Sequence, residues 1–303
     1  MVPSRRIFIS GPTAVGKSEI ALRLAEKIGG EIISVDSMQV YRGMDIGTSK
    51  PSPEERSRIP HHLLDVCELS ESFDAARFCR LAGQAVVEIE SRNHVPIFCG
   101  GTGLYYRAFL EGLGDAPPAN PTLRIELEKL PTEALLLELE KADPATFARI
   151  DRQNRRRLIR AVEVLRLTGK PFSIQRAIWT PTPPSGAAFF ALKRTTADLQ
   201  TRINHRVDRM FARGLVEETR QLLARGLDKN PTALQALGYR QVVEMLQTGR
   251  PLAETIELVK IRTRQFAKRQ MTWFRRQAGM QWIELSPGTA ASEVAGRILS
   301  LGI

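Results

Sequence analysis

The chain has 303 residues, of which 43% are hydrophobic and 25% charged, and its net charge at pH 7 is +11. This composition is ordinary for a globular protein, and the length suggests about two domains. No run of eighteen apolar residues occurs, so we expect no membrane span, and a strand that begins within five residues leaves no room for a signal peptide. Three cysteines without a C-x-x-C pair argue against a disulfide framework and favour a reducing, cytoplasmic setting.

The positive charge is concentrated towards the C-terminus. Residues 1–110 carry 13 basic and 13 acidic side chains, whereas residues 201–303 carry 17 basic and 9 acidic ones. Such asymmetry indicates a polyanionic partner, of which nucleic acid is the first candidate. A basic surface that serves only solubility is the alternative.

The strongest local signal is the run Gly11–Ser18, which reads G-P-T-A-V-G-K-S and matches the phosphate-binding loop pattern. A β-branched and aromatic run, residues 5–10, precedes it, and residues 19–28 have helical apolar spacing. In such a strand–loop–helix unit, loop N–H groups and the helix N-terminus face an anion. Lys17 supplies a positive charge to the phosphates, and the Ser18 hydroxyl can hold a magnesium ion.

A second strand is predicted over residues 31–35, directly before Asp36. Ligands of open parallel sheets bind beyond the carboxyl ends of the strands, so Asp36 is placed to reach whatever the phosphate loop holds. The alternative is that Asp36 only caps a following turn. The pair His61-His62 lacks any further Cys/His spacing for zinc, and we interpret it as part of a loop or of the core.

An amphipathic helix over residues 73–90 and a buried strand over 95–99 lead to a second glycine turn, Gly100–Tyr105. This turn lies on the ligand side of the predicted sheet. Thr102 within it either contacts substrate or caps the helix that follows.

The pattern changes between Gly112 and Gly186, where strand signals vanish and helices are predicted at about 121–130, 132–142 and 152–168. This segment contains the run Arg155-Arg156-Arg157-Leu158-Ile159-Arg160. Successive arginines cover most of a helix circumference, which favours phosphate contacts over a purely solvated stripe. We expect a helical insertion in an α/β core.

The chain returns to the sheet with a strand at 187–192, and a helix at 198–212 carries arginines at 202, 206, 209 and 213 on one face. Residues 237–241 place Tyr239 beside Arg240, a pairing used to stack bases. A long basic helix at 252–277 and a strand at 281–285 complete the chain.

Six motifs together resemble the tRNA dimethylallyltransferase family: Gly11–Ser18, Asp36–Tyr41, Gly43–Thr48, Gly100–Tyr105, Gly238–Gln241 and Lys268–Trp273. They follow the order of that family and extend over nearly the whole chain. The resemblance implies an α/β fold, a P-loop-type parallel sheet core flanked by helices, with a helical insertion domain. Residues 1–111 and 187–303 would form the catalytic core, and residues 112–186 the insertion that contacts the tRNA anticodon stem-loop.

The resemblance also implies transfer of a dimethylallyl group from dimethylallyl diphosphate to the adenine immediately 3′ of the anticodon. Asp36 would take or orient the proton of the exocyclic amine, and Thr13, Lys17 and Arg206 would stabilise the leaving diphosphate. Magnesium would bind at Ser18. The diphosphate site would comprise Gly11, Pro12, Thr13, Ala14, Val15, Gly16, Lys17 and Ser18.

By the same resemblance, a further set of residues would lie against tRNA: Asp36, Ser37, Met38, Gln39, Thr102, Arg124, Arg156, Arg157, Leu158, Ile159, Arg160, Gln235, Ala236, Leu237, Gly238, Tyr239 and Arg240. Because residues 154–157 are more basic than the resemblance requires, the resemblance does not decide which of these arginines contact RNA. We expect a monomer with no membrane partner.

Three other functions use parts of this pattern. A small-molecule kinase would use the phosphate loop for ATP, although a basic C-terminal third does not suit a small acceptor. An adenylate isopentenyltransferase would use the same donor with a free nucleotide, whereas the arginine-rich insertion favours RNA. A non-enzymatic RNA-binding protein would have no need of Asp36 at the strand end.

Overall fold

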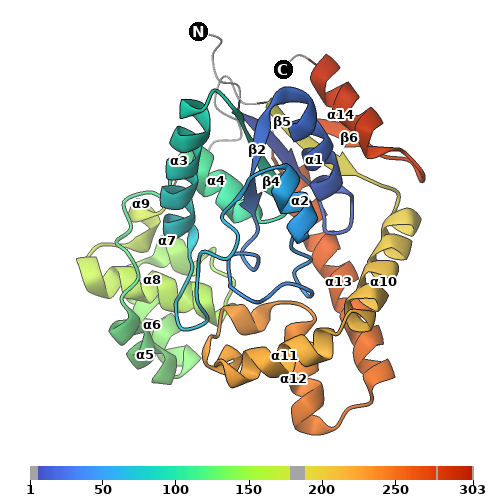
Figure 1. Cartoon of the computed structure of the whole chain (residues 1–303). Coiled ribbons are helices and arrows are strands. Elements are labelled where there is room, and N and C mark those ends of the chain that lie inside the picture. The colour runs from blue at the N-terminus through green and yellow to red at the C-terminus, as the bar shows by residue number, and fades with distance from the viewer. Residues whose placement is uncertain (1–5, 178–187, 278, 302–303) are drawn as a thin grey trace. The chain divides into compact units, whose positions relative to one another are not determined.

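The computed structural model of the chain describes residues 6–177, 188–277 and 279–301. The chain divides into two compact units, Met1–Leu110 with Pro181–Ile303, and Glu111–Thr180. The first unit has an α/β fold built on a parallel sheet, and the second is helical (Figure 1). The predicted class, a parallel sheet core flanked by helices with a helical insertion, is confirmed.

The sheet of the first unit has the strand order β3-β2-β4-β1-β5-β6, and each neighbouring pair is parallel. Its strands are β1 (Ile7–Ser10), β2 (Gly30–Val35), β3 (His61–His62), β4 (Val95–Gly100), β5 (Ala188–Lys193) and β6 (Gln281–Glu284). The central strands are buried on both faces and read as continuous apolar runs, as strands covered by helices do.

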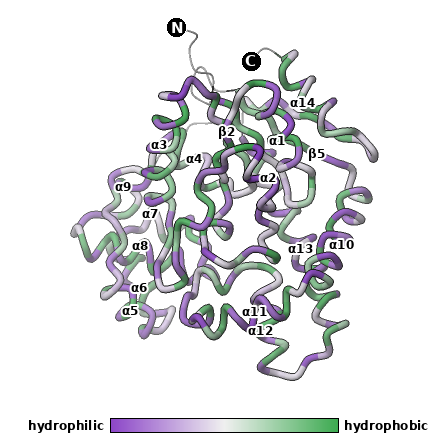
Figure 2. Tube along the Cα trace, viewed as in Figure 1, coloured by the Kyte–Doolittle hydropathy of each residue, from purple (hydrophilic) through white to green (hydrophobic). Residues whose placement is uncertain are grey.

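Helices cover both faces of this sheet. The helices of this unit are α1 (Lys17–Ile28), α2 (Pro53–Arg58), α3 (Ala75–Ser91), α4 (Gly103–Glu111), α10 (Thr196–Ala212), α11 (Leu215–Ala224), α12 (Tyr239–Thr248), α13 (Leu252–Arg275) and α14 (Ala291–Ser300), with short 3₁₀ turns at Leu227–Lys229 and Ala233–Gln235. These helices carry both hydrophobic and hydrophilic residues, as amphipathic helices do (Figure 2).

Alternate residues of each strand face different layers. Ile7 and Ile9 of β1 pack with α1 and α14, whereas Phe8 between them packs on the other face with residues of α3, α4 and α13. The Phe8 ring stacks between Phe98 of β4 and Phe189 of β5, with ring centroids 4.6 and 5.3 Å away. The aromatic layer fixes the three central strands against one another.

The second unit has a small core of its own. Its helices are α5 (Pro121–Lys129), α6 (Thr132–Ala142), α7 (Pro144–Phe147), α8 (Arg155–Thr168) and α9 (Phe172–Gln175). Leucines of α5 and α6 pack on Leu158, Ile159 and Val162 of α8. The three longer helices match the predicted ranges within a few residues, while α7 and α9 were not predicted.

The pair His61-His62 differs from its prediction. His61 and His62 form the short edge strand β3 beside β2, so their assignment to a loop or to the core was wrong. The last residues of the predicted insertion, 178–186, the start of the predicted strand at 187 and residue 5 lie outside the described residues. Among the helices of the described ranges, none is long and apolar enough to cross a membrane.

Glu31 of β2 is a polar anchor at the amino end of the sheet. Its carboxylate is 1% exposed and accepts hydrogen bonds from Arg92, His62 and His94. Burial alone would raise the pKa of this carboxyl, but the hydrogen bonds from Arg92 and the two histidines lower it to about 2. The charged form is therefore the one that stabilises the fold.

We predict that Glu31→Gln lowers the free energy of unfolding at pH 7 by about 3 kcal/mol, because it leaves Arg92 without its buried partner. The folded-state pKa lies below the unfolded one, so the stabilisation is complete above pH 4.5 and is lost as the pH falls towards 2. Urea unfolding at several pH values, with Glu88→Gln on the exposed side of α3 as control, measures this difference. An equal difference at pH 7 and pH 3 would contradict the assignment.

Candidate functional site

The carboxyl ends of β1, β2 and β4 lie in one row. Ser10 pairs with Gly100, and Gly100 pairs with Val35. The residues that follow these strands are the phosphate loop, the second glycine turn and Asp36, so three loops distant in sequence begin side by side. The cavity beyond them, of about 320 Å³, lies wholly within the first unit.

The lining of this cavity contains both polar and apolar side chains. The polar side chains include Thr13, Asp36, Ser37, Thr48, Thr102, Arg206, Arg269 and Gln270. The apolar ones include Met38, Val207, Met210, Leu237, Val259 and Phe266. A site of this kind suits a ligand with a charged end and an apolar end.

Two arginines donate hydrogen bonds to main-chain carbonyls of the phosphate loop. Arg202 Nε donates to the Ala14 carbonyl and Arg194 Nε to the Val15 carbonyl, each at 2.8 Å. Because the carbonyl of one residue and the N–H of the next point in opposite directions, these bonds turn the Val15 and Gly16 N–H groups away from the arginines. Ala14 and Gly16 have φ of 64° and 112°, the left-handed conformations of an anion-binding nest.

Lys17 stands at the first turn of α1, and its Nζ donates to the Pro12 carbonyl at 2.8 Å. Burial lowers the pKa of this ammonium to about 8, with the charge of Arg206 adding to the effect and Asp36 opposing it. Without an anion beside it, Lys17 thus loses its proton at a lower pH than an ordinary lysine does. An anionic ligand would restore the favoured charged form.

Arg206 extends from α10 into the cavity, where Nη2 donates to the Thr48 carbonyl at 3.3 Å. Burial lowers the pKa of its guanidinium and the charge of Asp36 opposes that shift. An arginine keeps its charge under such a shift. The structure thus brings Thr13, Lys17, Asp36 and Arg206, the four predicted catalytic residues, to one site.

Asp36 uses one carboxylate oxygen for its own loop. Oδ1 accepts hydrogen bonds from the N–H groups of Met38 at 2.8 Å and Gln39 at 3.3 Å. In the part of the chain that the structure describes, Oδ2 accepts none. The capping role and the functional role predicted for Asp36 are therefore compatible.

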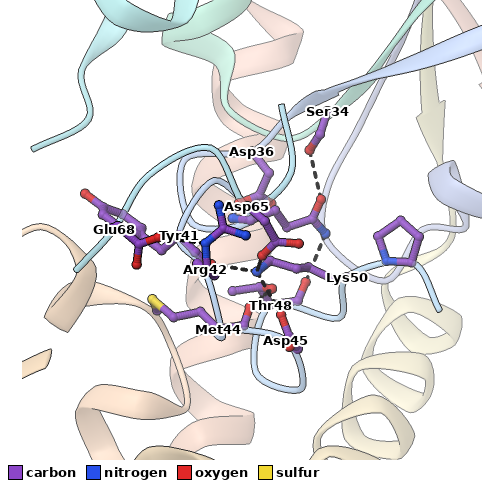
Figure 3. A network of polar contacts seen from close by, with 12 residues as sticks. Ser34, Asp36, Tyr41, Arg42, Met44, Asp45, Thr48, Lys50, Asp65 and Glu68 are labelled. Carbon is purple, nitrogen blue, oxygen red and sulfur yellow. Dashed lines mark hydrogen bonds and ion pairs between the residues drawn. The ribbon is translucent and has the colours of Figure 1, made fainter. Parts of the chain in front are cut away.

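The loop that carries Asp36 is tied down by a buried lysine (Figure 3). The Lys50 side chain is 1% exposed, and its ammonium donates to the Tyr41 carbonyl at 2.6 Å, to Asp45 Oδ1 at 2.8 Å and to Asp65 Oδ1 at 2.5 Å. The Gln39 amide donates to the Thr48 carbonyl, the same acceptor that Arg206 uses. Lys50 and Gln39 hold the main chain to which Arg206 is bonded.

Tyr239 has a role different from the predicted base stacking. The side chain is 0% exposed, so no base can lie on its ring, and the stacking hypothesis is wrong for this residue. Its hydroxyl donates to Glu218 Oε1 at 2.5 Å and accepts from the Gly47 N–H at 3.0 Å. A Cβ on Gly47 would lie 2.4 Å from the Tyr239 ring, which explains the glycine.

The neighbours of Tyr239 differ in exposure. Gln235, Ala236 and Leu237 line the cavity, where they can reach a ligand. Gly238 has a φ of 91°, and its N–H donates to Gln241. Arg240 is exposed and pairs with Glu244 on the same helix.

The basic run of the insertion divides into structural and surface residues. Glu163 is 0% exposed and accepts hydrogen bonds from Arg124, Arg160 and the Asn120 N–H. Leu158 and Ile159 belong to the core of the unit, so for their side chains the predicted contact with RNA is wrong. Arg156 and Arg157 lie on the exposed first turn of α8, where the predicted RNA contact stays a prediction.

Sequence reasoning assigned no role to Gln270, Glu218 or Lys50, each of which bonds to a loop at the cavity. Gln270 lies within a recognised motif, flanked by Arg269 and Met271. An uncharged polar residue on the buried side of an otherwise basic helix is the signal that points to it. Glu218 and Lys50 carry no such signal, because the groups they bond to follow no local sequence pattern.

The fold and the site define an α/β protein whose phosphate-binding loop, with Lys17, faces a cavity that also holds a carboxylate and an arginine. The family model described as IPP transferase matches residues 39–277. A tRNA dimethylallyltransferase of Geobacter sulfurreducens is 45% identical over 286 residues, which cover 93% of this chain and 92% of the relative. One of Moorella thermoacetica is 46% identical, with 92% of this chain and 89% of the relative covered.

Solved structures agree with this relationship. The full-length tRNA isopentenylpyrophosphate transferase of Bacillus halodurans is 38% identical with a TM-score of 0.70, covering 98% of this chain and 96% of that one. A eukaryotic dimethylallyltransferase acting on tRNA is 28% identical with a TM-score of 0.80, covering 98% and 79% of the two chains. The chain therefore belongs to the IPP transferase family.

We predict that Lys17 makes anion binding at the loop fall with rising pH. Because its pKa is about 8, affinity for inorganic diphosphate should drop about tenfold per pH unit above 8. Calorimetric titration between pH 7 and 9.5 measures the drop. Lys17→Arg, which stays charged throughout, corrects for ionisation of the ligand. A constant affinity ratio between the two proteins would contradict the prediction.

We predict that Tyr239→Phe lowers the free energy of unfolding by about 1 kcal/mol, since it removes the hydrogen bonds that the hydroxyl makes to Glu218 and to the Gly47 N–H. Denaturant unfolding measures this loss, and Tyr105→Phe, whose hydroxyl makes neither bond, is the matched control. A stacking role would need only the ring, which the variant keeps. Unchanged stability would contradict the role assigned to the Tyr239 hydroxyl.

Proposed function

We propose that the protein transfers the dimethylallyl group of dimethylallyl diphosphate to the exocyclic amine of the adenine immediately 3′ of the anticodon in tRNA. The observation that carries this proposal is the placement of a phosphate loop, Arg206 and Asp36 around one cavity that also has apolar lining residues. The names of the relatives support the same reaction for proteins of this family.

In this reaction the amine nitrogen forms a bond to the allylic carbon while the carbon–oxygen bond to the diphosphate breaks. Negative charge develops on the leaving diphosphate, where the N–H groups of residues 14–18, Thr13, Lys17 and Arg206 stabilise it. The proton of the amine goes to Asp36, whose Oδ2 faces no other donor among the described residues. The apolar lining formed by Val207, Met210 and Phe266 suits the dimethylallyl chain.

The adenine has to leave the stack of the anticodon loop to reach this cavity, which costs a few kcal/mol and least for a base in a loop. The basic residues of 201–303 and the exposed arginines of α8 supply contacts to the RNA backbone. A free nucleotide is too small to contact basic residues spread over so much of the chain. We therefore favour tRNA over AMP or ATP as acceptor.

We propose that magnesium binds at Ser18 together with the diphosphate. Ser18 is exposed at the first turn of α1, and its hydroxyl is a hard oxygen ligand. Among the described residues no cluster of three His, Cys, Asp or Glu side chains could hold a metal alone, and magnesium commonly takes phosphate oxygens and waters as its remaining ligands. The ion would supply positive charge to the leaving group.

We propose that the protein acts as a monomer. The cysteines of the chain are unpaired, which fits action in the reducing cytoplasm.

The experiment that tests the proposed function offers labelled dimethylallyl diphosphate with an anticodon stem-loop, AMP and ATP as competing acceptors. Label on the RNA adenine alone is expected. Label on AMP or ATP would indicate a nucleotide-prenylating enzyme. Consumption of ATP without any transfer would indicate a kinase.

We predict that Asp36→Asn lowers turnover by about 100-fold or more, because proton transfer in the reaction loses its base. The amide keeps an oxygen for the Met38 and Gln39 N–H groups, so the loop and the affinity for the stem-loop should be preserved. Single-turnover rates and RNA binding measure the two effects, with the exposed Asp228→Asn as control. Equal losses of binding and turnover would contradict the assigned role.

A further inference from the structure

Gln270 of α13 lies at the cavity with 8% of its surface exposed, and both ends of its amide are bonded to main chain. Oε1 accepts a hydrogen bond from the Thr13 N–H at 2.9 Å. Nε2 donates to the Gly101 carbonyl at 2.9 Å. One side chain thus joins the phosphate loop to the second glycine turn.

The connection continues to Asp36. Thr102 follows Gly101, and its Oγ1 accepts from the Ser37 N–H at 3.2 Å. The N–H groups of Gly101 and Thr102 both donate to the Val35 carbonyl at 3.2 Å. A continuous series of hydrogen bonds and peptide links therefore runs from Thr13, on the diphosphate side, to Asp36, on the amine side.

The second glycine turn is shaped to admit α13. A Cβ on Gly101 would lie 2.3 Å from Gln270 Nε2, and a Cβ on Gly103 would lie 2.4 Å from the Trp273 ring. Any larger residue at these two positions would push the helix, and with it the amide, out of place. The glycines here serve close packing, whereas those of the first loop serve an anion.

We propose that Gln270 is a positioning residue that sets the distance between the leaving-group site and the base, acting through Thr13 and Thr102. This inference rests on the proposed function. Transfer requires the diphosphate, the allylic carbon and the amine to be aligned, and a shift of about 1 Å can cost about 100-fold in rate. Only a neutral amide offers a donor and an acceptor from one short planar group at this point, since a carboxylate cannot donate and a thioether does neither strongly.

Gln270→Met tests the role, because it keeps an unbranched side chain of similar length and removes both bonds. We expect kcat for stem-loop prenylation to fall about 30–100-fold, with the RNA dissociation constant within about threefold of wild type. Thr255→Val removes a buried side-chain hydrogen bond of the same helix away from the cavity, and should leave kcat unchanged. A kcat within threefold of wild type for Gln270→Met, or an equal loss of RNA binding, would overturn the proposal.

Gln270→Glu gives a readout that a purely structural role would not move. The introduced carboxyl can donate to the Gly101 carbonyl only when it is protonated, so its rate relative to that of Gln270→Met should rise as the pH falls from 8.5 to 5.5. Asp36, Arg206 and Arg269 line the cavity, and Lys17 lies near Asp36 and Arg206. These charged groups are common to both variants, so the ratio isolates the effect of residue 270. A ratio that does not change with pH would overturn the proposal even if one variant folds poorly.

The two proposals fail in different ways. If the wild-type protein does not prenylate the stem-loop, the proposed function fails, whatever the variants do. If wild type is active and the Gln270 variants are equally active, only the positioning role fails.

Discussion

The close approach of β4 to β2 is the constraint on which the site depends. A Cβ on Gly100 would lie 2.1 Å from the Val35 carbonyl oxygen, so only glycine allows the two strands to end together. The register of Ser10 with Gly100 adds the phosphate loop to the same edge. The phosphate loop and Asp36, which we propose as the leaving-group site and the base, are distant in the sequence and thereby come to lie at one cavity.

Loops rich in glycine offer few side chains for packing, and buried polar side chains hold them instead. Lys50, Glu218 and Gln270 each bond to main-chain groups of loops around the cavity. Inside a protein such bonds are strong when every group is satisfied, and an unpaired group is costly. The loops are therefore fixed before substrate arrives, which is what electrostatic stabilisation of a leaving group requires.

The sequence predicts those parts of the molecule whose signals are local. The phosphate loop, Asp36 at the end of β2 and the long helix α13 follow from short-range patterns. The roles of Arg124 and Tyr239 do not, because they depend on Glu163, 39 residues from Arg124, and on Gly47, 192 residues from Tyr239. The sequence alone predicts that the basic run contacts RNA. The structure shows that Arg160 of this run pairs with the buried carboxylate of Glu163.

The measurement that tests the central claim most directly is a crystal structure with an unreactive thio analogue of dimethylallyl diphosphate and an anticodon stem-loop. The account predicts diphosphate oxygens within about 3 Å of Lys17 Nζ and of N–H groups in residues 14–18, with the adenine amine at hydrogen-bond distance from Asp36 Oδ2. A diphosphate bound away from the loop, or an adenine that does not reach Asp36, would contradict it.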